Sequence, residues 1–162
     1  MYRVYKPKIV KNALNLWPPF WGAGISIVSI SDDFQCVTVR LKHRWWNKNA
    51  NRSQYGGSIF SMTDPIFSLM LMGILREKYY VWDSKAEIEF LKPGFSILSA
   101  EFIISSEVLK EIYAATESGD KYFPQFETKV VDTKGVVVAR IKRTLYIRKK
   151  PQFRSEELKN AL

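Results

Sequence analysis

One segment near the middle of the chain, residues 55–76, carries almost no charge and is apolar on nearly every side. As a helix it would be about 30 Å long, which is enough to cross a small domain. Other elements have to cover a helix that is apolar all round. Because Asp64 and Pro65 interrupt the segment, it does not resemble a membrane span, and we expect a buried central helix without a membrane partner.

The composition of the chain fits one domain with a sizeable core. Of its 162 residues, 46% are hydrophobic and 14% are aromatic. We expect a single domain over residues 1–162, with an N-terminal helix in residues 1–16 and a tail at residues 151–162. The only cysteine, Cys36, cannot form an internal disulfide, and no run of residues resembles a signal peptide. We therefore expect a reducing, cytoplasmic setting and assign no role to Cys36.

Apolar and polar residues alternate in several segments, as they do in half-buried strands. These segments are residues 24–31, 34–42, 84–92, 97–105, 123–131 and 136–149. The first two and the last two are separated by short turns and should form hairpins. Residues 17–24, with two prolines and three large aromatic side chains, predict a rigid loop. Residues 107–117 predict a short helix capped by Ser105 or Ser106 and closed near Gly119, and residues 155–158 could open a last helical turn.

The order of these elements lacks the regular strand–helix alternation of a doubly wound parallel sheet. It favours an α+β fold in which an antiparallel β-sheet of about six strands wraps around one long central α-helix. This is the hotdog arrangement.

The start of the expected central helix resembles the hotdog thioesterases related to phenylacetyl-CoA thioesterase. In that family a histidine and two glycines open the helix, and an acid follows seven residues after the second glycine. Gly56, Gly57 and Asp64 keep this spacing, while Tyr55 occupies the histidine position. Asn49 stands six residues before that position, where the family often carries an asparagine.

The resemblance covers about residues 17–150, and residues 85–93 resemble the family strand that ends in a bulky residue, a basic residue and proline. More narrowly, the Pro-Pro-Phe entry with Gly24, the signature at residues 62–65 and the short helix at Glu107 are similar to an uncharacterised subfamily described as tetrameric acyl-CoA thioesterases. The resemblance implies an acyl-CoA substrate and a homodimer with a shared active site, paired further into a tetramer. Nothing in the sequence indicates a metal or a cofactor.

Two groups in the central segment suit thioester chemistry. Backbone N–H groups left free at glycines that open a helix can stabilise an oxyanion, and Gly57 is the candidate donor. Asp64, expected to be shielded by neighbouring apolar side chains, would act as general base toward water, or would attack the thioester directly to give an anhydride. The catalytic candidates are Asp64, Gly57 and Asn49, and the substrate-binding candidates are Tyr55, Gly56, Ser61 and Arg52. Glycines before a helix also form simple tight turns, and a buried acid also pairs within a core.

The geometry of a continuous helix favours a site shared between two chains. Gly57 and Asp64 are seven residues apart, which is two turns and about 10 Å, so they share a face but cannot contact the same carbon atom. Gly57, Ser61, Asp64 and Ser68 would form a stripe of small or polar residues along that face. Two such helices lying antiparallel across a twofold axis would bring Asp64 of one chain close to Gly57 of the other.

Three other functions remain open from the residues alone. A non-catalytic acyl-CoA-binding protein would explain Tyr55 in the histidine position. The formal net charge of +9 suits nucleic acid, but the basic stripe formed by Arg140, Lys142, Arg148, Lys149 and Lys150 lacks interleaved aromatic residues other than Tyr146, so we expect no nucleic-acid partner. Hotdog hydratases need a paired histidine and acid, and the only histidine, His43, is expected at the surface.

Overall fold

The computed structural model describes residues 5–154, so the helical turn expected at residues 155–158 lies outside the described residues. The chain forms a mixed α+β fold. Its helices are α1 (Pro7–Leu16), α2 (Pro18–Ala23), α3 (Gly56–Ser61), α4 (Ile66–Leu75) and α5 (Ser106–Thr116), and its strands are β1 (Ile25–Ile30), β2 (Cys36–Leu41), β3 (Tyr79–Phe90), β4 (Leu98–Ile103), β5 (Lys121–Tyr122), β6 (Gln125–Asp132) and β7 (Val137–Lys149). Short 3₁₀ turns follow α4 at Arg76–Lys78 and β7 at Pro151–Phe153.

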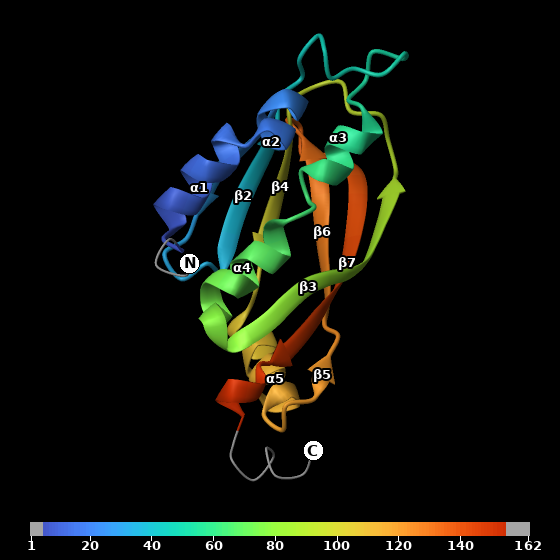
Figure 1. The fold of residues 1–162 in the computed structure, drawn as a ribbon. Coiled ribbons are helices and arrows are strands. Elements are labelled where there is room, and N and C mark those ends of the chain that lie inside the picture. Colours follow the sequence, from blue (N-terminus) through green and yellow to red (C-terminus); the bar gives the residue numbers. More distant parts are fainter. Residues whose placement is uncertain (1–4, 155–162) are drawn as a thin grey trace.

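A single antiparallel sheet wraps around the central helical segment, as the sequence predicted (Figure 1). The sheet has seven strands in the order β1-β2-β4-β6-β7-β3, and the seventh, β5, pairs with β7. The two expected hairpins are present, as β1 with β2 and as β6 with β7. The two-residue β5 was not expected, because so short a segment has no alternation to detect. The fold is the hotdog arrangement.

The core lies between the inner face of the sheet and α4. Phe67 of α4 packs on Phe102 of β4 and Phe126 of β6, with ring centroids 5.1 and 4.8 Å apart. Met70 and Leu71 of the same helix are also buried, at 1% and 0% exposed. The apolar segment is therefore covered as its composition requires.

The long central helical segment, Gly56–Lys78, is present as expected, and it has a short break at residues 62–65, so the spacing of Gly57 and Asp64 does not run along a continuous helix. Helix α3 ends at Ser61 and α4 begins at Ile66, so residues 62–65 form a link between them. Pro65 has no N–H to continue the helix, and its ring disfavours helical backbone at the preceding residue, Asp64. The Asp64 N–H instead donates to the Ser61 carbonyl at 3.2 Å, a tighter turn than that of an α-helix.

By length and composition alone, the stretch Gly56–Lys78 is long and apolar enough to cross a membrane. In this fold 61% of its most apolar window is buried inside the protein. The sheet covers the stretch, as it covers the core helix of a hotdog fold.

Residues 17–24 are helical rather than a loop, which corrects a second expectation. Pro18 and Pro19 occupy the first positions of α2, where the missing N–H groups would have had no partner in the helix. Gly24 ends the helix with a φ of 79°. The prolines therefore mark the start of a helix and do not exclude one. The other helical expectations hold, since α1 follows Pro7 and Ser105 caps α5 by accepting from the Val108 N–H.

Candidate active site

A pocket of about 380 Å³ lies where the loop after β2 meets the start of α3 and the end of β3. Its lining is Asn49, Asn51, Ser53, Gln54, Gly56, Ile59, Phe90, Leu91, Lys92, Pro93 and Gly94. The pocket brings together two of the candidate residues, Asn49 and Gly56, with the Lys92-Pro93 end of the strand that carried part of the resemblance. Gln54 is 2% exposed, and its Oε1 has no hydrogen-bond partner among the described residues.

The two glycines that open α3 lie under aromatic rings. A Cβ atom on Gly56 would lie 3.1 Å from the ring of Phe90, and a Cβ atom on Gly57 would lie 2.3 Å from the ring of Tyr55. The first helical hydrogen bonds here run from the Ser58 and Ile59 N–H groups to the Tyr55 carbonyl. Within the described part of the chain, the N–H groups of Gly56 and Gly57 therefore have no protein acceptor, as is usual in the first turn of a helix.

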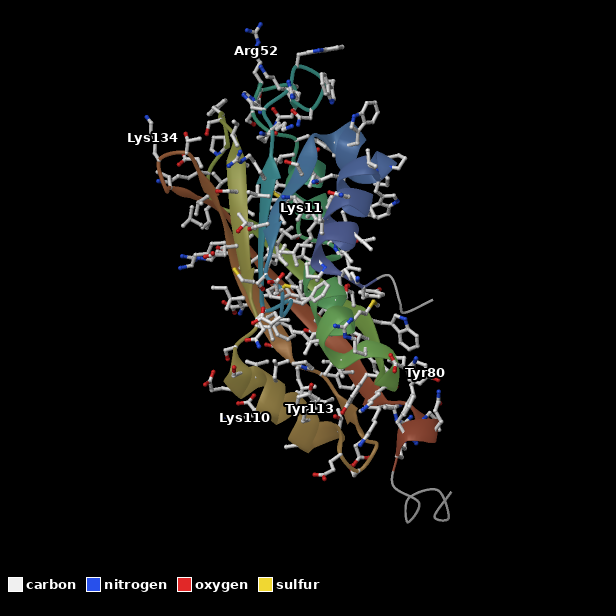
Figure 2. The ribbon with its side chains drawn as sticks, turned by 90° about the vertical axis from the view of Figure 1, so that its left-hand side faces the viewer. Lys11, Arg52, Tyr80, Lys110, Tyr113 and Lys134 are labelled. Carbon is white, nitrogen blue, oxygen red and sulfur yellow. The ribbon has the colours of Figure 1, made fainter. Side chains whose placement is uncertain are left out.

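The remaining candidates of this region have distinct surroundings. Asn49 organises its own loop, since its Nδ2 donates to Ser53 Oγ at 2.8 Å and its Oδ1 accepts from the Ser53 N–H at 3.1 Å. Arg52, with a φ of 62°, extends away from the molecule at the tip of this loop and is not part of the pocket lining (Figure 2). Ser61 is partly buried at the last position of α3. The structure thus places Asn49 and Gly56 at the pocket and leaves Arg52 outside it.

Asp64 lies in the link between α3 and α4, and this corrects the expectation that it is buried. Its side chain is 60% exposed in the single chain, because the break in the helix turns it away from the core. One carboxylate oxygen, Oδ1, accepts from Arg143 Nη1 at 3.0 Å. Asp64 is therefore ion-paired rather than shielded among apolar side chains, and it is not part of the lining of the pocket at Gly56.

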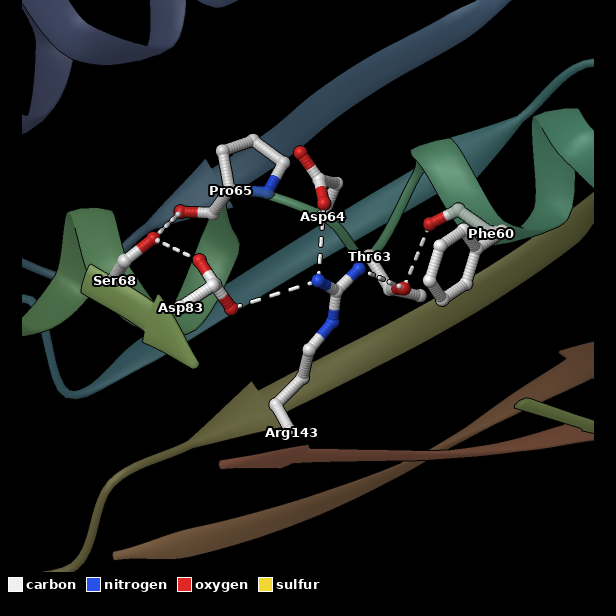
Figure 3. A network of polar contacts seen from close by, with 7 residues as sticks. All are labelled: Phe60, Thr63, Asp64, Pro65, Ser68, Asp83 and Arg143. Atoms are coloured by element: carbon white, nitrogen blue, oxygen red, sulfur yellow. Dashed lines mark hydrogen bonds and ion pairs between the residues drawn. The ribbon is translucent and has the colours of Figure 1, made fainter. Parts of the chain in front are cut away.

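Arg143 of β7 is the centre of a polar network around this link (Figure 3). Its side chain is 2% exposed. Besides Asp64, its Nη2 donates to Thr63 Oγ1 at 3.3 Å, and its Nη1 lies 3.5 Å from Asp83 Oδ1. The guanidinium also lies over the ring of Phe60, 4.8 Å from its centroid. Its buried Nε has no partner within residues 5–154.

Asp83 of β3 is the second carboxylate of this network. The pairing of β3 with β7 shifts between Asp83 and Lys85, so a β-bulge follows Asp83 directly. Its Oδ2 accepts from Ser68 Oγ at 3.0 Å, and its side chain is 31% exposed. Burial raises the pKa of the Asp83 carboxyl above its ordinary value and the nearby Asp64 adds to this, while Ser68 and Arg143 act in the opposite direction.

Sequence reasoning missed both Arg143 and Asp83, although one signal was present. Ile141, Leu145 and Ile147 alternate along one face of the last strand, and Arg143 falls on that same face by the same alternation. A charged residue at an inward position indicates a buried ion pair. Asp83 gave no such signal, because the expected strand began at residue 84 whereas β3 begins at Tyr79.

Two surface features concern the basic stripe of β7, which a nucleic-acid-binding protein would use. Arg140 pairs with Glu89 at 3.5 Å and Lys142 with Glu127 at 3.0 Å, so acids of neighbouring strands partly neutralise the basic stripe of β7. Trp82 of β3 stacks on Tyr146 with centroids 5.7 Å apart, an aromatic neighbour that the linear pattern did not reveal.

Cys36 lies in β2. Burial raises the pKa of its thiol, and the adjacent Glu101 adds to this effect. A protonated thiol is a poor nucleophile, and Cys36 again receives no role.

Solved structures with this fold include several proteins described as thioesterases. A protein of unknown function and probable thioesterase from Pseudomonas aeruginosa superposes with a TM-score of 0.81 at 15% identity, over 90% of this chain and 99% of that one. A thioesterase from Haemophilus influenzae gives a TM-score of 0.65 at 11% identity, over 89% and 91% of the two chains. The PaaI protein from the Escherichia coli phenylacetic acid degradation operon gives 0.58 at 19% identity, over 87% and 91%.

At these identities the superpositions establish the fold, and the resemblance read from the sequence to hotdog thioesterases agrees with them. No curated protein matches the chain by sequence. The family model for the domain of unknown function DUF4442 matches residues 7–147. The match takes in the central helical segment, the pocket and Arg143, and the chain belongs to the DUF4442 family.

Proposed function

We propose that this protein is an acyl-CoA thioesterase. Water attacks the thioester carbonyl carbon while Asp64 accepts a proton from that water, and the resulting oxyanion is stabilised by N–H groups at the start of α3. Collapse of the tetrahedral intermediate breaks the C–S bond. The acyl group leaves as a carboxylic acid, and the coenzyme leaves as a thiolate that then takes up a proton. Direct attack by Asp64, followed by hydrolysis of the anhydride, is the alternative route with the same residue.

One observation carries this proposal: the pocket beside Gly56 opens onto a helix start whose first N–H groups lack protein acceptors among residues 5–154. Such groups, with the positive end of the helix dipole, suit an oxygen that becomes negatively charged. The position of Gly56 in the lining makes its N–H a donor candidate beside that of Gly57. Lys92 at the pocket supplies a positive charge for the phosphates of a coenzyme A substrate.

The separation of Asp64 from this pocket supports a site built by two chains. Asp64 is ion-paired in the link after α3, and its exposed side leaves it available to a neighbouring copy. We propose a homodimer in which Asp64 of one protomer serves the pocket of the other, with dimers paired into a tetramer. A cytoplasmic location is part of the same proposal.

A second candidate is an acyl-CoA-binding protein without hydrolysis. The ring of Tyr55 covers Gly57, and Tyr55 stands where the resembling enzymes carry a histidine. Calorimetric binding of acyl-CoA at the affinity expected of a substrate, with no release of thiol over hours, would favour this candidate over the thioesterase.

Hydrolysis of acyl-CoAs of graded chain length, followed with a thiol reagent, tests the main proposal. We expect turnover of at least one chain length, and Asp64→Ala should lower the rate at least about a hundredfold, as loss of a general base does. Asp32→Ala is the matched control, because Asp32 is exposed in the turn between β1 and β2. A folded Asp64→Ala protein with an unchanged rate would remove Asp64 from the mechanism.

A further inference from the structure

Arg143 is a charged residue at a buried position whose neighbours on the same strand face are apolar. It lies on the inward face of β7 between Ile141 and Leu145, which are 1% and 0% exposed. A buried guanidinium loses its hydration, and hydrophobic residues often replace buried ion pairs with no loss of stability. The role of Arg143 therefore has to be found in the groups that its charge holds in place.

The contacts of Arg143 fix one oxygen of Asp64 and leave the other free. Nη1 holds Oδ1 of Asp64 at 3.0 Å, and Nη2 is anchored on Thr63 Oγ1 at 3.3 Å. Thr63 in turn donates to the Phe60 carbonyl at 2.8 Å, so its hydroxyl is oriented to accept from Arg143. Within the described residues, Oδ2 of Asp64 has no hydrogen-bond partner.

Asp83 braces the guanidinium from the opposite side. The distance of 3.5 Å between Asp83 Oδ1 and Arg143 Nη1 is longer than the 3.0 Å between Asp64 Oδ1 and the same nitrogen. The other oxygen of Asp83, Oδ2, accepts a hydrogen bond from Ser68 Oγ. The bulge after Asp83 sets the direction of this side chain at the strand position opposite Leu145. Two elements thus converge on the cation that β7 carries: the link after α3 and strand β3.

We propose that Arg143 and Asp83 are positioning residues for the reaction of Asp64. Arg143 holds Oδ1 of Asp64, so that Oδ2 is the oxygen that accepts the proton of the attacking water. Asp83 holds the guanidinium of Arg143 in place when the Asp64 side chain moves. This inference rests on the proposed function for its catalytic consequence. The coupling of the two carboxylates through Arg143 is a property of the fold and can be measured without substrate.

The charged groups that face Asp83 are Arg143 from β7 and Asp64 from the link, and α4 contributes the neutral hydroxyl of Ser68. Each charge acts on Asp83 in a known direction. Removing Asp64 takes away a like charge and leaves Arg143 to Asp83 alone. Removing Arg143 takes away the cation and leaves the like charge.

Kinetics of Arg143 variants test the catalytic part. Arg143→Lys keeps the charge but loses the planar fork that spans Asp64 and Thr63, so we expect kcat to fall about a hundredfold with KM within about twofold. Arg140→Lys is the matched control, on the same strand but exposed, and should leave both parameters unchanged. A kcat within twofold of wild type in folded Arg143→Lys would overturn the positioning role.

Carbon-detected NMR titration of the Asp83 carboxyl tests the coupling itself. We expect the pKa of Asp83 to fall in Asp64→Asn, to rise in Arg143→Met and to stay constant in Arg140→Lys. If Arg143→Met does not fold, Arg143→Gln replaces it, because glutamine also lacks the positive charge. Identical titrations in all of these proteins would overturn the coupling, even where hydrolysis is present. The predicted shifts in a protein that hydrolyses no acyl-CoA would uphold the coupling and refute the proposed function.

Discussion

At the scale of single residues, Asp83 is the clearest case of a side chain that costs stability in its native surroundings. It is largely removed from water, its contact with Arg143 is long, and a second carboxylate lies nearby. Proteins tolerate such groups mainly at functional sites, where a perturbed carboxyl is of use.

The folded protein binds the Asp83 proton more tightly than the unfolded chain does, because its pKa is raised on folding. The stability linked to this proton is therefore fully present below the ordinary aspartate pKa and is lost as pH rises through the raised value. Asp83→Asn removes this loss, so the unfolding free energy of the variant relative to wild type should rise with pH across that window. Urea unfolding from pH 4 to pH 8 measures the difference. A difference that stays constant or declines with pH would contradict the assignment.

At the scale of elements, the central segment is shaped by one break and one close approach. The break at Pro65 brings Asp64 out of the core and toward Arg143. The close approach is at Gly73 of α4, where a Cβ atom would lie 2.5 Å from the ring of Phe34. Phe34 is 2% exposed and has a φ of 62°, so neither its ring nor its backbone can move aside easily.

Gly73→Ala should therefore destabilise the protein by about 1–3 kcal/mol through overpacking, in spite of the better helix propensity of alanine. Gly22→Ala in α2 is the matched control, because no atom of the described part of the chain lies within 4 Å of the added methyl group. That control should be neutral or more stable by up to about 1 kcal/mol. Chemical unfolding of the two variants decides the point, and equal effects at both sites would refute the packing argument.

At the scale of the whole molecule, the proposed site is divided between two places in one chain. The pocket lies at the start of α3, whereas Asp64 and its network lie beyond the end of that helix. A twofold arrangement of copies would join them, with the same residues contributed by each protomer.

Mixing two inactive variants tests this arrangement. Asp64→Ala removes the carboxylate, and Gly57→Val places a side chain where the Tyr55 ring now lies, 2.3 Å from the new Cβ. Random exchange makes half of the dimers mixed, each with one intact site of two, so about a quarter of wild-type activity should return. Each variant incubated alone is the control. No recovery despite proven exchange, or a fully active monomer in sedimentation, would refute the shared site.

Local sequence patterns were sufficient for most of the elements. Alternation identified both hairpins, Pro7 marked the start of α1, and the Ser105 cap with its following helix was correct. The apolar central segment by itself required a fold that encloses it, and the glycine and acid spacing pointed to the hotdog thioesterases. These features depend on neighbours within a few residues of one another, which the linear chain displays.

The network around Asp64 depended on contacts that the linear chain does not display. Asp64 is separated from Arg143 by 79 residues and Arg143 from Asp83 by 60, so their meeting is set by the pairing of β3 with β7 and by the break at Pro65. Burial and ion pairing follow from that meeting, since both depend on which elements cover a side chain. The sequence alone determined the enclosing sheet and the glycine start of α3, and only the tertiary structure decided that Asp64 is exposed and held by a buried arginine.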